Sequence, residues 1–462
     1  MAMRSSGKIG FITCASYRVH RPTVLDVRSK ACALLSRLSR ELDVQLVAPD
    51  VVPASGAELD RVLDAIARAE PDALILHLAG WTEDETTLKI VDAVGCPALL
   101  WVTGDVVADG VSRLIAHVGY MEASAFLRKM GRPVPRLYGG PDEESFRHLR
   151  AFALAAGGVS DLRRLNFGWI GQGCGSEGML DGAFDENEFA KKTGVHFLHL
   201  ALAELFERYR SVPLAGDPAR NERLRALGVS MDALADLRRT DPRAVDDSLR
   251  LLLALWDFVA ERNLGALSLR CFPEFRENDV PSPCLAIAIL NQRGVPASCE
   301  GDVLSGVSMC LLASLSRRPA TIMDVFARDD RLNTLRLFHC GSAAPALAGP
   351  DAPVQYRTHC KPANHRAGVT VEFPLPPGRV SFLKFDMIGP RCALFLYQGD
   401  ALPPPAELRG THAVVRTDTP VNALVESLLD HGVSHHQVLS PGDVSLAADY
   451  CARLLNMDLV CL

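Results

Sequence analysis

The sequence predicts an α/β protein with two doubly wound, Rossmann-like parallel sheets, followed by a small antiparallel β-barrel-like domain with a terminal helix. Strand-like and helix-like segments alternate through most of the 462-residue chain, as they do in βαβ units. From residue 369, short strand-like segments instead follow one another across Pro-Gly and Gly-Pro turns, which is typical of a meander or barrel. The length suits about three domains of roughly 150 residues each.

The first expected domain spans residues 1–145 and alternates apolar runs with amphipathic runs. Because buried parallel strands read as short apolar runs, we expect strands at 8–16, 44–49, 73–80, 97–104 and 114–120. Apolar residues recur at helical spacing in two further segments, and we expect helices at 27–42 and 57–70. A basic stretch with several Pro and Gly residues, 128–144, marks the end of this domain.

The second expected domain spans 146–343 and the third 344–462. By the same criteria, the second has strands at 165–171, 195–200, 266–272, 296–302, 320–326 and 335–341, and helices at 187–194, 202–210, 244–263, 284–294 and 303–316. The third has strand-like segments at 369–375, 379–387 and 392–400. It closes with a helix at 421–432, the segment 434–440 and a helix at 443–456.

Composition points to a cytoplasmic protein without a nucleic-acid or membrane partner. The formal net charge of -6 argues against a nucleic-acid-binding surface. Thirteen cysteines without a CxxC pair are typical of free thiols in a reducing compartment. The basic N-terminus has no sustained apolar core like that of a signal peptide, and no apolar run approaches the roughly 18 residues of a membrane helix.

Four residues in the last third of the chain could form a metal site: Glu300, Asp324, His339 and His436. Each lies at or near the end of a predicted strand, and two carboxylates with two imidazoles suit one divalent ion that keeps open positions. Other roles remain open. Glu300 or the nearby Asp302 could cap the following helix, and His339 could be a hydrogen-bonded core residue.

The spacing of these residues gives them a pattern. The segments 299–326 and 434–460 resemble the metal-binding segments of the L-fucose isomerase and L-arabinose isomerase superfamily. In those enzymes a Glu, a second carboxylate some two dozen residues later and a His near the C-terminus bind Mn²⁺. The resemblance implies that Glu300, Asp324 and His436 are ligands, and it places His339 where arabinose isomerases have an additional ligand. Asp324 follows the fucose-type pattern, whereas His339 follows the arabinose-type pattern.

The resemblance implies a metal-dependent aldose–ketose isomerase that works through a cis-enediol. Glu300 and Asp324 would be both ligands and proton carriers, with Mn²⁺ as the ion and Mg²⁺ or Co²⁺ as alternatives. It also implies a homo-oligomer, a trimer or hexamer with shared active sites. Two other readings stay open: a sugar-binding or regulatory protein on the same fold without turnover, and a metal-dependent epimerase or lyase of a sugar derivative.

Five residues are candidates for contact with the sugar substrate. By the resemblance, Trp81 would stack on the sugar in a neighbouring subunit, although an ordinary rim aromatic is the alternative. Arg18 and His20 follow the first predicted strand and could meet an acidic group on the substrate, or they could be a solvated basic loop. Glu274 is expected to end a strand. His435 is adjacent to His436, so on a strand the two side chains would point to opposite faces.

A glycine motif at 173–178, GCGSEG, matches the pattern of dinucleotide-binding loops. The segment MLDGAFD separates it from the next expected helix, so its glycines do not open a helix that could receive a pyrophosphate. We therefore expect no nucleotide cofactor, and we expect this motif to be a substrate-side loop or a turn.

Overall fold

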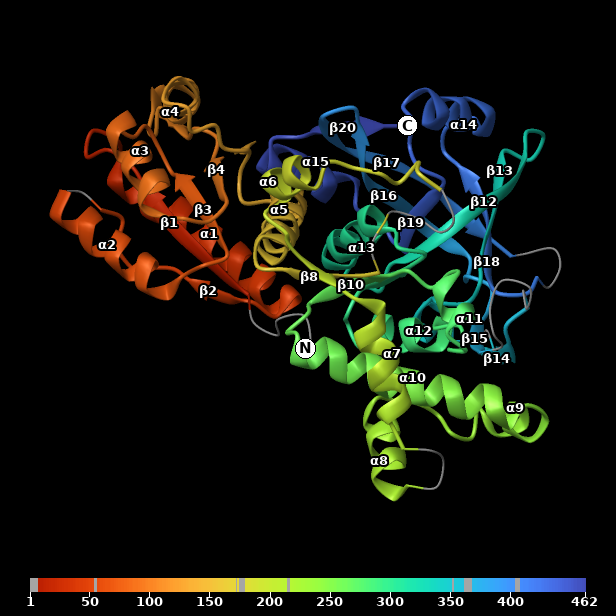
Figure 1. Cartoon of the computed structure of the whole chain (residues 1–462). Helices are drawn as coiled ribbons and strands as arrows, with labels where there is room; N and C mark the ends of the chain where they lie inside the picture. Colours follow the sequence, from red (N-terminus) through yellow and green to blue (C-terminus); the bar gives the residue numbers. More distant parts are fainter. Residues whose placement is uncertain are drawn as a thin grey trace. The chain divides into compact units, whose positions relative to one another are not determined.

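The computed structural model describes residues 7–53, 56–171, 173, 179–213, 217–350, 353–360, 368–403 and 408–462. The chain forms two compact units (Figure 1). The N-terminal unit comprises Met3–Ser160 and Asp449–Asn456, and most of the C-terminal unit is the segment Asp161–Ala448, completed by Met457–Leu462. The three-domain division at 145 and 343 stays a prediction.

A five-stranded parallel sheet forms the centre of the N-terminal unit, in the order β2-β1-β3-β4-β7. The predicted strands at 8–16, 44–49, 73–80 and 97–104 are confirmed. The elements of this unit are β1 (Lys8–Cys14), α1 (Arg21–Leu42), β2 (Gln45–Val47), α2 (Gly56–Ala69), β3 (Ala73–Leu78), α3 (Asp84–Ala93), β4 (Ala98–Val102), β5 (Val107–Ala108), β6 (Val111–Ser112), α4 (Ala116–Lys129), β7 (Arg136–Tyr138), α5 (Glu143–Arg163) and α15 (Ser445–Leu455), the last two extending a few residues beyond the unit.

The strand predicted at 114–120 is wrong, because α4 begins there. Ile115 adopts a left-handed conformation with φ 52° immediately before the helix. The buried residues of α4 are Ala116, Gly119, Ala123 and Leu127, which recur every three to four positions. A seven-residue apolar window is too short to show that helical period.

The C-terminal unit contains a four-stranded parallel sheet in the order β11-β10-β8-β9. The strands and helices predicted in this region are confirmed, and α8, α9 and α11 are additional. The elements are β8 (Asn166–Ile170), α6 (Glu186–Thr193), β9 (His196–Leu200), α7 (Leu202–Ser211), α8 (Pro218–Ala226), α9 (Ala235–Thr240), α10 (Pro242–Glu261), β10 (Ala266–Leu269), α11 (Glu274–Glu277), α12 (Cys284–Gln292), β11 (Ala297–Cys299) and α13 (Val303–Ser316).

The rest of this unit is a closed antiparallel barrel with the strand order β16-β19-β12-β13-β18-β17, closed by pairing of β17 with β16. The expected antiparallel barrel is confirmed. Two of its strands lie before residue 343, since 320–326 and 335–341 join the barrel and not the parallel sheet. The elements are β12 (Thr321–Asp329), β13 (Thr334–His339), η1 (Pro345–Leu347), β14 (Gln355–Thr358), β15 (Val369–Glu372), β16 (Gly378–Ile388), β17 (Arg391–Leu402), β18 (Thr411–Thr417), α14 (Val421–Asp430), β19 (His436–Pro441) and β20 (Asp458–Cys461).

Helix α13 joins the two parts of the C-terminal unit. It contacts β10 and β11 of the parallel sheet and also β12, β16 and β19 of the barrel. Its first ten residues are all buried except Cys310, so both sides of the helix are covered. The N-terminus of α13 therefore lies where the edge of the parallel sheet meets the barrel.

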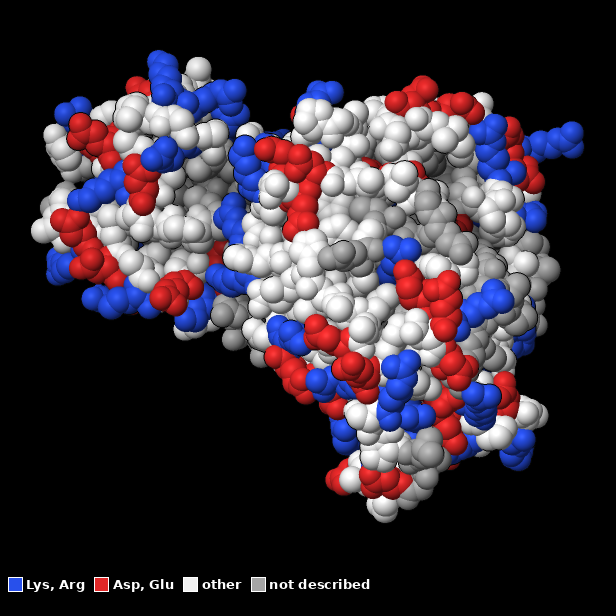
Figure 2. Space-filling model, in the orientation of Figure 1, with Lys and Arg blue, Asp and Glu red and all other residues white. Residues whose placement is uncertain are grey.

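The described surface carries mixed charge. On the face drawn in Figure 2, basic and acidic side chains are interspersed, without a large area of one sign among the described residues. The described residues on this face therefore form no basic stripe of the kind that nucleic-acid-binding proteins use. Among the helices that the structure describes, none is long and apolar enough to cross a membrane.

Candidate metal centre

The four residues singled out from the sequence converge in the C-terminal unit. The Nε2 atom of His436 lies 3.6 Å from Oδ1 of Asp324 and 3.8 Å from Oε2 of Glu300. Oε1 of Glu300 lies 3.9 Å from Nε2 of His339. Asp324, His339 and His436 each offer a ligand atom within 4.8 Å of the others. Two carboxylates and two imidazoles therefore surround one small volume.

Barrel pairing places two of these side chains opposite each other. Asp324 on β12 is directly opposite His436 on β19 in the antiparallel ladder, a position from which side chains on one face meet. His339 is the last residue of β13, one position beyond the partner of Asp324. Contrary to the sequence prediction, Asp324 is not at a strand end, because β12 continues past a bulge at Val325 and Ala327 to Asp329.

Glu300 comes from the parallel sheet, immediately after β11 ends at Cys299. Both Glu300 and Gly301 have positive φ, 61° and 72°. A left-handed conformation is costly for a residue with a side chain and tends to occur at functional sites. Here it breaks the strand's alternation and turns the Glu300 carboxylate toward the two histidines.

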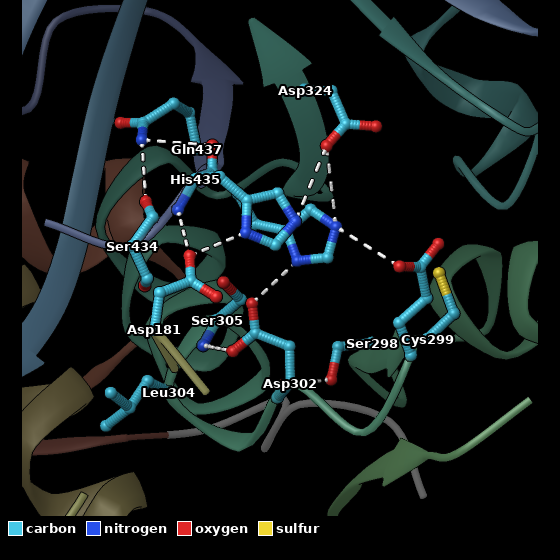
Figure 3. Close-up of polar contacts among 12 residues, drawn as sticks. Asp181, Ser298, Cys299, Asp302, Leu304, Ser305, Asp324, Ser434, His435 and Gln437 are labelled. Carbon is cyan, nitrogen blue, oxygen red and sulfur yellow. Dashed lines mark hydrogen bonds and ion pairs between the residues drawn. The ribbon is translucent and has the colours of Figure 1, made fainter. Parts of the chain in front are cut away.

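Asp302 performs two tasks at the start of α13. Its Oδ1 accepts the backbone N–H of Ser305 at 2.9 Å, which confirms the helix-capping role for Asp302 and excludes it for Glu300. Its Oδ2 lies 2.9 Å from Nδ1 of His436, and Figure 3 shows Asp302 and Asp324 on opposite sides of His435. Burial by itself would raise the pKa of Asp302, but the charge of Lys384 and the hydrogen bond with His436 hold that pKa well below its usual value.

The environment of His436 fits a metal ligand. Asp302 occupies Nδ1, while Nε2 is buried and has no hydrogen-bond partner among the described residues. Burial by itself would lower the pKa of His436, but the hydrogen bond and charge of Asp302 outweigh burial and raise it. A carboxylate that orients one imidazole nitrogen while the other faces further carboxylates is the arrangement around metal-binding histidines. The donor set therefore fits a divalent cation.

His435 also faces the site, and the expectation that adjacent histidines must diverge is wrong. Strand β19 begins at His436, so His435 precedes the region of regular alternation. Its backbone N–H and Nδ1 both contact Oδ2 of Asp181, at 2.9 and 2.7 Å. The two imidazole rings consequently lie 4.2 Å apart between centroids, and Nε2 of His435 lies 3.9 Å from Oδ1 of Asp324.

A buried polar network holds the backbone of the two histidines in place. The Lys384 ammonium, almost fully buried, donates to the carbonyl oxygens of His436 and Ser434, at 2.6 and 3.3 Å. Asp386 accepts from the backbone N–H and the hydroxyl of Ser434, both at 2.8 Å. Because Lys384 binds carbonyls on both sides of His435, it fixes the backbone from which both imidazoles project.

A small pocket adjoins this centre. Its lining combines the metal-site side chains with the segment that carries Asp181, and consists of Met179, Asp181, Gly182, Glu300, Asp302, Ser434, His435 and His436. Exposure differs within the site: the Glu300 and Asp324 side chains are 23% and 34% exposed, whereas that of His436 is 3% exposed. The two carboxylates are thus more exposed than the imidazole, and of the two only Glu300 lines the pocket.

The remaining candidate in this unit, Glu274, forms an ion pair with Arg270 at 2.9 Å. It does not end a strand as expected, because β10 stops at Leu269 and Glu274 opens the short helix α11. Its assignment to the substrate stays a prediction. Of the glycine motif at 173–178 the structure describes Gly173 alone, so that expectation lies outside the described residues.

The candidates Trp81, Arg18 and His20 lie in the N-terminal unit, beyond the carboxyl ends of β3 and β1. The Arg18 guanidinium lies 5.5 Å from the centre of the Trp81 ring, within the range of a cation–π contact. Arg18 and His20 are exposed, and His20 contacts the hydroxyl of Thr23 at 2.7 Å. The structure therefore groups Arg18 with Trp81, and their contact with a sugar stays a prediction.

Comparison with known proteins adds to this geometry. No protein-family model matches the chain. The chain is similar to sulfoquinovose isomerases. It is 26% identical to that of Alkalicoccus urumqiensis, over 89% of this chain and 90% of the relative. It is 28% identical to that of Clostridium sp. (strain MSTE9), over 91% and 92%, and 25% identical to that of Priestia megaterium, over 89% and 90%.

Solved structures add nothing to this comparison. An ABC transporter solute-binding protein from Burkholderia multivorans covers 68% of this chain and 95% of its own length, at 12% identity and a TM-score of 0.20. A TM-score this low carries no argument about fold or function. The similarity to isomerases thus rests on sequence over nearly the whole length of both chains.

Sequence reasoning missed the roles of three residues around the centre, Asp181, Lys384 and Asp302. Of these, Asp302 was considered only as a helix cap. Asp181 had a usable signal, because it follows the end of β8, and ligands of α/β proteins bind beyond the carboxyl ends of parallel strands. Lys384 also had one, since it interrupts the apolar run of β16 and a buried lysine needs a partner. The contact between Asp302 and His436 joins residues far apart in sequence, so only the fold could show it.

Proposed function

We propose that this protein is a metal-dependent aldose–ketose isomerase that acts on a sulfonated sugar of the sulfoquinovose type. The observation that carries the proposal is the convergence of Glu300, Asp324 and His339 on the buried Nε2 atom of His436, which has no hydrogen-bond partner within the described part of the chain. Isomerisation moves a proton between C1 and C2 of the sugar through a cis-enediol, which requires a base beside the two carbons. The names of the relatives supply the class of sugar.

Each residue would have a defined task. Glu300, Asp324 and His436, with His339 as a fourth donor, would hold Mn²⁺, or Mg²⁺ or Co²⁺ in its place. When bound, the ion supplies charge that polarises neighbouring sugar oxygens and stabilises the negative charge that develops on them. The Glu300 and Asp324 carboxylates, which are both partly exposed, would remove and return the proton, a contribution of about 10²–10⁴-fold. Asp302 would keep the Nε2 lone pair of His436 directed at the site.

Substrate turnover in D₂O tests the proposal. The protein with Mn²⁺ is expected to convert sulfoquinovose to its ketose and to incorporate solvent deuterium at C1 of the ketose and at C2 of the recovered aldose, measured by NMR. The reaction with glucose, fucose and arabinose is expected to be slower, because these sugars lack the anionic group. Deuterium exchange with return of an epimer would identify an epimerase instead, and binding without exchange in the presence of Mn²⁺ would contradict catalysis.

A further inference from the structure

One thiol lies against the proposed metal centre and has no part in the mechanism above. The Sγ atom of Cys299 lies 3.8 Å from Nε2 of His339 and 4.0 Å from its Nδ1. Cys299 is almost fully buried, as is His339. The ligand atoms of Cys299, Glu300 and His339 all lie within 4.8 Å of one another. These three form a second possible ligand set that shares two members with the first.

The backbone at the end of β11 creates this second set. In a regular strand Cys299 and Glu300 would point to opposite faces. The left-handed conformation of Glu300 cancels that alternation, so that the thiol and the carboxylate both approach the same imidazole. Figure 3 shows the Cys299 sulfur on the side of the site away from Asp181 and Ser434.

The chemistry of the two sets differs. Carboxylates and imidazoles suit hard or borderline ions, whereas a thiolate favours borderline and soft ions such as Zn²⁺. In a tetrahedral zinc site with one sulfur, one nitrogen and one oxygen ligand, the ligand atoms lie about 3.4–3.6 Å apart. The separations of 3.8 and 3.9 Å around His339 are close to that spacing, so small side-chain movements would complete the site.

We propose that Zn²⁺ binds to Cys299, Glu300 and His339 at a position beside that of the catalytic ion. The inference rests on the proposed metal centre, because the two positions share Glu300 and His339. Zinc in the thiolate position therefore competes with the catalytic ion for Glu300 and His339. Binding displaces the thiol proton to solvent and involves no change of oxidation state. The centre thus takes two classes of ion at two overlapping positions.

Equilibrium metal affinities of variants test this inference. Cys299→Ser is expected to weaken Zn²⁺ binding by at least about 10-fold, since even outer-shell partners of a metal contribute about 10–100-fold, and to leave Mn²⁺ affinity within about two-fold. Asp324→Asn is expected to show the reverse pattern. Cys310→Ser is the matched control, because the Cys310 thiol donates to a helix carbonyl and lies outside both ligand sets. Unchanged Zn²⁺ affinity in Cys299→Ser, or an equal loss of both ions, would overturn the inference.

Zinc K-edge X-ray absorption of the wild-type protein provides a test that needs no variant. A sulfur neighbour at about 2.3 Å from zinc is expected, whereas a shell of nitrogen and oxygen alone would refute the thiolate position. Neither measurement depends on turnover. An inactive protein that shows the sulfur neighbour would contradict the proposed function and leave the zinc position standing.

Discussion

Asp324→Asn and Glu300→Gln are each expected to reduce isomerase turnover by at least about 10³-fold while the protein stays folded. Each change replaces a carboxylate by a neutral amide of nearly the same shape. It removes both a metal-binding charge and a proton carrier. Both side chains are partly exposed, at 34% and 23%, so neutralising one should not unfold the barrel or the sheet edge.

Asp330→Asn is the matched control for these variants. Asp330 follows β12 in the turn before β13, and it pairs with Arg328 at 3.3 Å on the surface. It should retain full turnover, because exposed ion pairs contribute little. Steady-state kinetics with saturating Mn²⁺, together with circular dichroism, measure both expectations. Wild-type turnover in Asp324→Asn or Glu300→Gln would rule out the proposed roles of these carboxylates.

Lys384→Met is expected to lower the free energy of unfolding by about 3–5 kcal/mol. The ammonium is 3% exposed, and it lies 3.8 Å from the Asp386 carboxylate and donates to two backbone carbonyls. Methionine leaves Asp386 and Asp302 buried without this cation, and an uncompensated buried charge is costly. Denaturant unfolding monitored by fluorescence measures the change.

Lys89→Met is the comparison for this experiment. Lys89 pairs with Asp60 on the surface of the N-terminal unit, where the side chains are 50% and 59% exposed. Its replacement should change the free energy of unfolding by no more than about 1 kcal/mol. If Lys384→Met and Lys89→Met had the same free energy of unfolding, the buried network around Lys384 would not stabilise the protein.

Most of the local structure could be predicted from sequence, because it follows from local patterns. The apolar runs of β1, β3 and β4 and the amphipathic face of α10 show their periods within a single segment. The helix α4 was missed, since its buried small residues resemble a strand over a short window. Sequence alone does not determine which distant strands pair, and the barrel depends on that pairing.

The same distinction applies to the site. Glu300, Asp324, His339 and His436 could be selected by residue type, position and resemblance, and the structure brings them together. The residues that orient them could not be selected, because their roles arise from contacts across the fold. Asp181 holds His435 from a loop after β8. That contact also explains why the alternation rule failed at His435.

A manganese anomalous difference map from a crystal of the wild-type protein tests the central claim most directly. The account predicts one strong peak within about 2.0–2.6 Å of carboxylate oxygens of Glu300 and Asp324 and of Nε2 of His436. A peak bound elsewhere, or no peak here at a manganese concentration that saturates turnover, would contradict the metal centre on which the proposed isomerase depends.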